Sequence, residues 1–155
     1  MPFFAGLDLG QAADYTAFVI VEQTPSPADS LHRYVLRNIH RWSLGTPYPK
    51  IVKDVCGWFS RYPLRGSPLC VDNTGVGRAV MDIFRQQEGL EAKLVPITIV
   101  NAFSPNFQKG EWHVPKKDLI GVLKVLWGCN PQRLQIVKQP LQILIHREIA
   151  TFRGK

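Results

Sequence analysis

The sequence has few cysteines and no long apolar run, and these absences exclude several classes of protein. Its 155 residues include three cysteines, Cys56, Cys70 and Cys129, which are odd in number and widely spaced. This pattern excludes a disulfide framework and a CxxC metal site, and it fits a reducing cytoplasm. The longest apolar runs, such as AFVIV at 17–21, are far shorter than the roughly 20 residues that a membrane span needs. We therefore expect no membrane association.

We also expect no targeting signal, and the sequence contains no phosphate-binding P-loop and no block of like charges. Its first ten residues, MPFFAGLDLG, have no basic segment and reach a charge at Asp8, so we expect no signal peptide. No GxxxxGK[ST] sequence occurs, which excludes a P-loop ATPase motor. Lys and Arg outnumber Asp and Glu by 19 to 12, giving a net charge of +7. Basic proteins tend to associate with polyanions such as nucleic acid.

The length and the composition predict one globular domain over residues 1–155. Apolar residues make up 45% of the chain and charged residues 20%, which are ordinary values for a globular protein. The strands are expected over Phe3–Leu9, Tyr15–Gln23, Leu31–Ser43, Pro68–Asp72 and Ala92–Val100. The helices are expected over Tyr48–Tyr62, Gly77–Glu88, Pro115–Trp127 and Pro140–Phe152. Because three antiparallel strands precede alternating helices and strands, we predict an α/β fold with a mixed five-stranded sheet and helices on both faces.

Weaker patterns lie between these elements. Residues 101–109 read as a polar loop, and 111–114 and 133–137 as short extended pieces. Arg33, Arg37 and Arg41 alternate with apolar residues and are expected on one solvated strand face, as phosphate contacts or as protection of a sheet edge. Phe103 and Trp112 would anchor the core, which is the preferred interpretation, stack on bases, or mark a mobile flap.

The strongest chemical feature is a pair of aspartates. Asp8 ends the first expected strand and Asp72 ends the fourth, each after a tight apolar run. Ligand sites in open α/β sheets gather at the carboxyl ends of strands, so the two carboxylates converge if these strands are neighbours. Oxygen ligands without a His or Cys cluster select a hard cation, Mg²⁺ or Mn²⁺. Such ions drive phosphodiester hydrolysis. Each aspartate alone would more simply cap a turn or a helix.

Basic and glycine-rich segments offer secondary candidates. Gly75-Val76-Gly77-Arg78 could cradle a phosphate at a helix start, but a tight strand-to-helix turn is the simpler interpretation. Arg78, Lys116 and Lys117 are candidate contacts to a DNA backbone, against the alternative of ordinary solvated side chains.

Four segments resemble the nuclease domain of phage terminase large subunits. They are GLDLGQAADYTAFVIVEQ (6–23), VDNTGVGRAVMDIFR (71–85), HVPKKDLIGVLKVL (113–126) and RLQIVKQPLQILIHREIATFRGK (133–155). The resemblance implies an RNase H-like fold related to RuvC-type resolvases. It also implies cleavage of double-stranded phage DNA during packaging, two divalent metal ions, packaging proteins as further partners, and a cytoplasmic, phage or prophage origin. Asp8 matches the first metal-binding acid of that family and Asp72 the second.

The third metal-binding acid of the family has no counterpart, because it lies in a helix beyond the segment that 133–155 matches. The domain is therefore expected to lack the final helix of the family. Asp14, Asp118 and Glu148 are the remaining substitutes, and none of them has a motif in its favour.

Two alternatives to an endonuclease stay open. A domain without the third acid could bind DNA or a packaging protein without cutting. The segment Gly6-Leu7-Asp8-Leu9-Gly10 also resembles the first phosphate motif of actin-like kinases and chaperone ATPases, although those proteins need two such domains.

Overall fold

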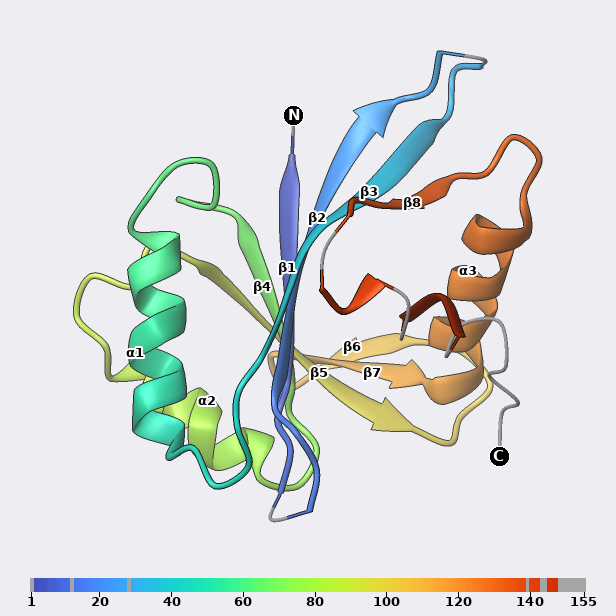
Figure 1. Cartoon of the computed structure of the whole chain (residues 1–155). Coiled ribbons are helices and arrows are strands. Elements are labelled where there is room, and N and C mark those ends of the chain that lie inside the picture. The colour runs from blue at the N-terminus through green and yellow to red at the C-terminus, as the bar shows by residue number, and fades with distance from the viewer. Residues whose placement is uncertain (1, 12, 28, 139, 143–144, 148–155) are drawn as a thin grey trace.

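A single mixed sheet organises the chain (Figure 1). The structure, a computed structural model, describes residues 2–11, 13–27, 29–138, 140–142 and 145–147. Its elements in chain order are β1 (Phe3–Asp8), β2 (Ala17–Pro25), β3 (His32–Arg41), α1 (Tyr48–Phe59), β4 (Pro68–Asp72), α2 (Gly77–Arg85), β5 (Lys93–Val100), β6 (Asn106–Gln108), β7 (Glu111–Pro115), α3 (Lys116–Gly128) and β8 (Leu134–Ile136). The expected helix over 140–152 lies largely outside the described residues.

The strands follow the order β6-β7-β5-β4-β1-β2-β3-β8 across the sheet. Strands β1, β2 and β3 pair antiparallel, whereas β4 and β5 continue from β1 in parallel. The predicted α/β class and the mixed sheet are therefore confirmed. The described part of the sheet has eight strands and not five, because both short extended pieces pair with the outer strands of the expected block, β7 with β5 and β8 with β3. Strand β6 also forms within 101–109, which was expected to be loop.

One face of the sheet packs against α1 and α2. Alternate residues of the central strands, Leu7 on β1 and Leu69 on β4, point to this face and are almost completely buried. Helix α1 begins after Pro47, with Pro49 in its first turn, and contributes Val55 from its apolar side. Each such fully buried side chain stabilises the fold by roughly 1.5–3 kcal/mol.

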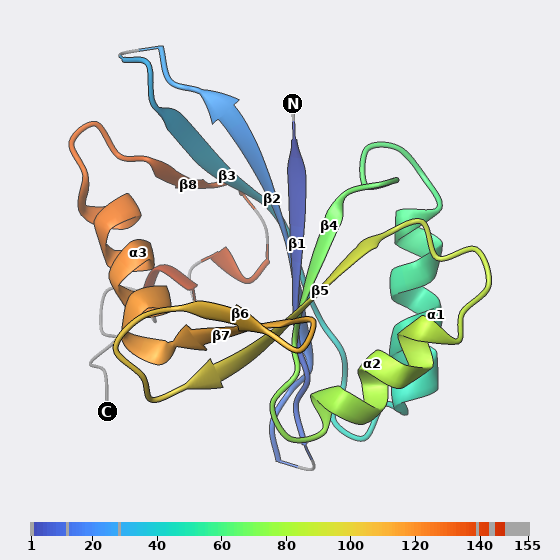
Figure 2. The same ribbon diagram turned by 180° about the vertical axis from the view of Figure 1, so that it is seen from behind.

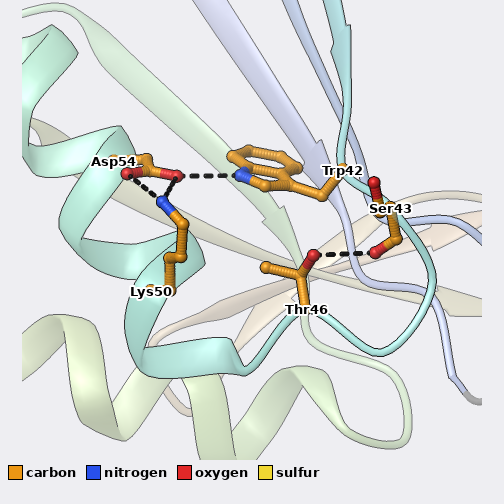
Figure 3. A network of polar contacts seen from close by, with 5 residues as sticks. All are labelled: Trp42, Ser43, Thr46, Lys50 and Asp54. Carbon is orange, nitrogen blue, oxygen red and sulfur yellow. Dashed lines mark hydrogen bonds and ion pairs between the residues drawn. The ribbon is translucent and has the colours of Figure 1, made fainter.

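A small polar network links the segment after β3 to helix α1 (Figure 3). The Trp42 indole Nε1 donates a hydrogen bond to Asp54 Oδ2 at 3.0 Å, and Lys50 Nζ contacts both oxygens of the same carboxylate. In the turn, Thr46 Oγ1 donates to the carbonyl oxygen of Ser43 at 2.7 Å. The hydrogen bond to Asp54 holds the ring of Trp42, which is buried.

Helix α3 lies on the opposite side of the sheet from α1 and α2 (Figures 1 and 2). None of its residues is buried, so its apolar side chains remain partly open to solvent. Among the described residues, no helix combines the length and the apolar character needed to cross a membrane.

The three arginines of β3 do not share one face, contrary to the expectation. The pairing of β2 with β3 shifts between Ile20 and Val21, which leaves Arg37 as an extra residue in β3. Such a bulge reverses the alternation of side chains beyond it. Arg37 forms an ion pair with Glu22, whereas Arg41 pairs with Ala17 and lies over the ring of Tyr15.

Candidate acidic site between two parallel strands

Asp8 and Asp72 lie side by side. Strands β1 and β4 are parallel neighbours, and Leu7 is directly opposite Val71. The next residue on each strand is an aspartate, so the same register aligns the two carboxylates. Both line one cavity of about 250 Å³ on the face of the sheet away from α1 and α2. The structure thus brings together the two residues that were expected to converge.

The electrostatics of this pair are unfavourable without a cation. Burial raises the pKa of the Asp8 carboxyl above its ordinary value, and repulsion from Asp72 and then Asp14 raises it further, against the lowering effect of the Leu9 backbone N–H. Two adjacent carboxylates repel unless a positive charge lies between them. The site therefore favours a bound proton or a metal ion.

Asp72 also has the local role that its position after a strand allows. Its Oδ1 accepts a hydrogen bond from the backbone N–H of Thr74 at 2.8 Å, as in an Asx turn. At Gly77, a Cβ would meet the carbonyl oxygen of Asp72 at 1.9 Å, so only glycine fits this strand-to-helix turn. The structure supports the simpler interpretation of the Gly75–Gly77 segment, because the close approach of the backbone accounts for Gly77. The Asx bond occupies one carboxylate oxygen and leaves the other available.

The rest of the cavity wall is mostly apolar. Its other lining residues are Gly6, Leu7, Ala17, Val19, Cys70, Val71, Ile97, Ile99 and Leu119. Burial raises the pKa of the Cys70 thiol, so this group stays protonated at neutral pH and is a poor ligand for a hard cation. The two aspartates are thus the donors that suit Mg²⁺ or Mn²⁺ in this cavity.

The three substitutes for a third acid differ in position. Asp14 is near enough for its charge to raise the pKa of Asp8, but it lines a separate cavity beside Gly10 and Tyr48. Asp118 lies in the first turn of α3, one residue before Leu119 of the cavity wall. Glu148 lies outside the described residues. Within the described part of the chain, no group of three or more His, Cys, Asp or Glu side chains is arranged to hold a metal ion.

A second polar cluster surrounds Glu111, which the sequence did not indicate. The Asn73 amide nitrogen donates to Glu111 Oε2, and His113 Nε2 lies 3.0 Å from Glu111 Oε1. Burial opposes ionisation of Glu111, yet the bond from Asn73 and the nearby His113 hold its pKa below its ordinary value. The alternation of Glu111 and His113 along a strand was the signal that could have paired them.

This cluster faces away from the two aspartates. His113 is opposite Thr98 on β5, whereas the neighbouring Ile97 lines the acidic cavity. Because adjacent residues of a strand point to opposite faces, Glu111 cannot serve as a third ligand beside Asp8. It is also already engaged by its neighbours.

The candidate DNA contacts separate into two groups. Lys116 and Lys117 are exposed and line a cavity of about 510 Å³ that shares Ile99 with the acidic cavity. Arg78 is exposed at the start of α2, and its charge acts on Glu111 on the other face. The lysines therefore adjoin the acidic site, and Arg78 does not.

Comparison with known proteins gives no independent assignment. A scan against models of protein families and a search among curated proteins found no match for this chain.

Proposed function

We propose that this chain is a divalent-metal-dependent endonuclease domain that hydrolyses phosphodiester bonds of double-stranded DNA, as terminase nuclease domains do. The observation that carries the proposal is the alignment of Asp8 and Asp72 at the ends of two parallel strands in one cavity. The raised pKa of Asp8 supports it, because burial and then repulsion from Asp72 disfavour the charged carboxylate, and a bound cation would relieve both effects.

The arrangement of the sheet also supports an RNase H-like scaffold. The five strands expected from the sequence form the contiguous block β5-β4-β1-β2-β3. Within it, β1, β2 and β3 pair antiparallel, and β4 and β5 are added in parallel beside β1. This is the order of strand types that the resemblance implies. A net charge of +7 suits a polyanionic substrate.

In this function, Asp8 and Asp72 would hold Mg²⁺ or Mn²⁺. The bound ion would activate water and stabilise the charge that develops on the phosphate. Lys116 and Lys117, from the adjoining cavity, would position the phosphate backbone.

The direct test is nicking of supercoiled plasmid with Mn²⁺, with Asp8→Asn and Asp72→Asn compared with the full chain. Loss of a contact that supports a metal ligand costs about 10–100-fold in activity, and loss of the ligand itself should cost more. We therefore expect the cleavage rate to fall by more than about 100-fold. Asp82→Asn is the matched control, because Asp82 is exposed on α2 and pairs with Arg85. Calorimetric Mn²⁺ binding should be weakened by the same two variants and unchanged in the control. Equal cleavage by all four proteins would reject the assignment.

A second candidate is a DNA-binding domain that does not cut. It is favoured by the finding that the described residues hold no group of three metal-ligating side chains. Salt-sensitive DNA binding without cleavage in Mn²⁺ would support this alternative, because phosphate contacts make affinity fall with salt.

A further inference from the structure

A row of side chains crosses the sheet in line with the two aspartates. Asp72 is opposite Ile97 on β5. Ile97 is opposite Trp112 on β7, and Trp112 is opposite Phe107 on β6. Directly opposed residues on neighbouring strands point to the same face of a sheet. Trp112 and Phe107 therefore lie on the face that carries Asp8 and Asp72.

The spacing of strands sets the distance along this row. Neighbouring strands are about 4.8 Å apart, so Trp112 lies roughly 10 Å from Asp72 and Phe107 about 14 Å from it. Figure 2 shows β6 and β7 beside β5 at this end of the sheet. Bases in a duplex strand are spaced about 3.4 Å apart along the axis. For bases that stay stacked, Trp112 is thus about three base steps from a phosphate that a metal ion would hold at the carboxylates.

The aromatic side chains here are exposed, contrary to the preferred expectation that Trp112 and Phe103 anchor the core. Phe103 is 95% exposed, Phe107 59% and Trp112 43%, whereas Phe59 in the core is 0% exposed. The rings of Phe107 and Trp112 contact one another, with centroids 5.3 Å apart. Large aromatic groups that pack together outside the core indicate a binding surface.

The charge beside the Phe103 ring is positive. Lys117 Nζ lies 5.1 Å from the centroid of the Phe103 ring, and Lys116 is its neighbour in the same cavity wall. Among the described residues, neither lysine forms an ion pair with an acid. Unpaired lysines beside exposed rings favour a polyanion with stacking groups over an apolar protein surface.

We propose that Phe107 and Trp112 stack on unpaired bases of a DNA strand whose phosphates contact Lys116 and Lys117, with Phe103, the ring that Lys117 approaches, as a further stacking group. The site would then prefer DNA with exposed bases near the cleavage point over fully paired duplex. This preference refines the proposed nuclease function and rests on it, whereas the stacking itself requires no metal ion.

The test measures binding of the full chain to a fluorescent single-stranded thymidine oligonucleotide and to a blunt duplex, in EDTA so that no cleavage occurs. Trp112→Leu and Phe107→Leu keep the apolar character and remove the stacking plane. Each should weaken single-strand binding about 5–150-fold, the range for loss of one base–aromatic stack. Tyr62→Leu is the matched control, since Tyr62 is 91% exposed outside the row, and it should bind as the unmodified chain does.

Salt dependence separates stacking from charge. The two aromatic variants should keep the original slope of log affinity against log salt concentration. The double variant Lys116→Gln with Lys117→Gln should have a shallower slope, by the amount that corresponds to about two lost phosphate contacts. Equal single-strand binding by Trp112→Leu, Phe107→Leu and Tyr62→Leu would overturn the proposal. So would a concentration-dependent dimer, seen in sedimentation, that Trp112→Leu abolishes, because the rings would then form a protein interface.

The cleavage assay keeps the two proposals apart. If the chain binds single strands through Trp112 but never cuts plasmid in Mn²⁺, the nuclease function fails and the stacking surface stands. If it cuts through Asp8 while the aromatic variants bind normally, only the stacking proposal fails. If both hold, DNA with a short mismatched bubble should be cut faster than intact duplex, and Trp112→Leu should remove that advantage.

Discussion

The two faces of the sheet differ in how completely they are packed. On the face covered by α1 and α2, Phe59 and Phe84 are 0% exposed. On the other face, α3 contributes no buried residue, and Leu123 remains 39% exposed. The closed face supplies the stability of the fold. The open face carries the carboxylates, the two cavities and the lysines. The groups that could bind a ligand or take part in a reaction therefore lie where packing is incomplete.

Truncation of one apolar residue on each face is the strongest test of this comparison. Phe84→Ala should lower the free energy of unfolding by about 3–5 kcal/mol, because it removes a fully buried ring and leaves a cavity. Leu123→Ala on α3 should cost less than about 1 kcal/mol, because much of its surface already contacts water. Urea unfolding of both variants measures the difference. Similar losses for the two would mean that the open face is covered by something that stabilises it.

Asp8→Asn tests the electrostatics of the open face. The folded chain holds the Asp8 proton at a higher pH than the unfolded chain, because burial and repulsion from Asp72 and Asp14 raise its pKa. The folded state therefore binds more protons above the ordinary value of 3.8, and stability falls as pH rises through that range. Without divalent ions, Asp8→Asn should be more stable than the unmodified chain at neutral pH, and the gain should shrink toward acid pH.

Thermal unfolding in EDTA across this pH range measures the gain. Adding Mn²⁺ should reverse the order, because the ion stabilises only the chain that keeps both carboxylates. An identical melting temperature for the two proteins at every pH would contradict a strained carboxylate pair.

The sequence predicted the central part of the fold well, because apolar runs and turn residues mark buried elements directly. Strand β4, from Pro68 to Asp72, has the predicted bounds. The edges were less accessible to such reasoning. Strand β6, Asn106–Gln108, has three exposed residues and no apolar alternation, so only its pairing with β7 makes it a strand. The spacing of residues does not indicate the bulge near Arg37. Regular alternation therefore predicted that the three arginines share one face.

The candidate site was predictable in part. Asp8 and Asp72 each follow an apolar strand, and the parallel pairing of β1 with β4 was enough to align them. The row to Trp112 depends on the register of two further strand pairs, and its extension to Phe107 on a third, none of which the sequence encodes locally. Trp112 was therefore expected in the core, because an aromatic residue in a short extended segment is more often buried than exposed.

Asp54→Asn provides the counterpart of Asp8→Asn on the closed face, with the opposite dependence on pH. The hydrogen bond from Trp42 is the main cause that lowers the pKa of Asp54, and Lys50 adds to it against the opposing effect of burial. This stability is present above the ordinary value of 3.8 and is lost as pH falls toward the depressed value. At neutral pH the substitution should cost about 1 kcal/mol, as for a partly exposed hydrogen bond to a charged group.

Urea unfolding of Asp54→Asn, Trp42→Phe and the double variant measures the coupling, and additive losses would show that the pair is not coupled. If Asp54→Asn lowers stability and Asp8→Asn raises it, the two carboxylates have different roles. Asp54 then stabilises the fold, whereas Asp8 is destabilising until a ligand binds.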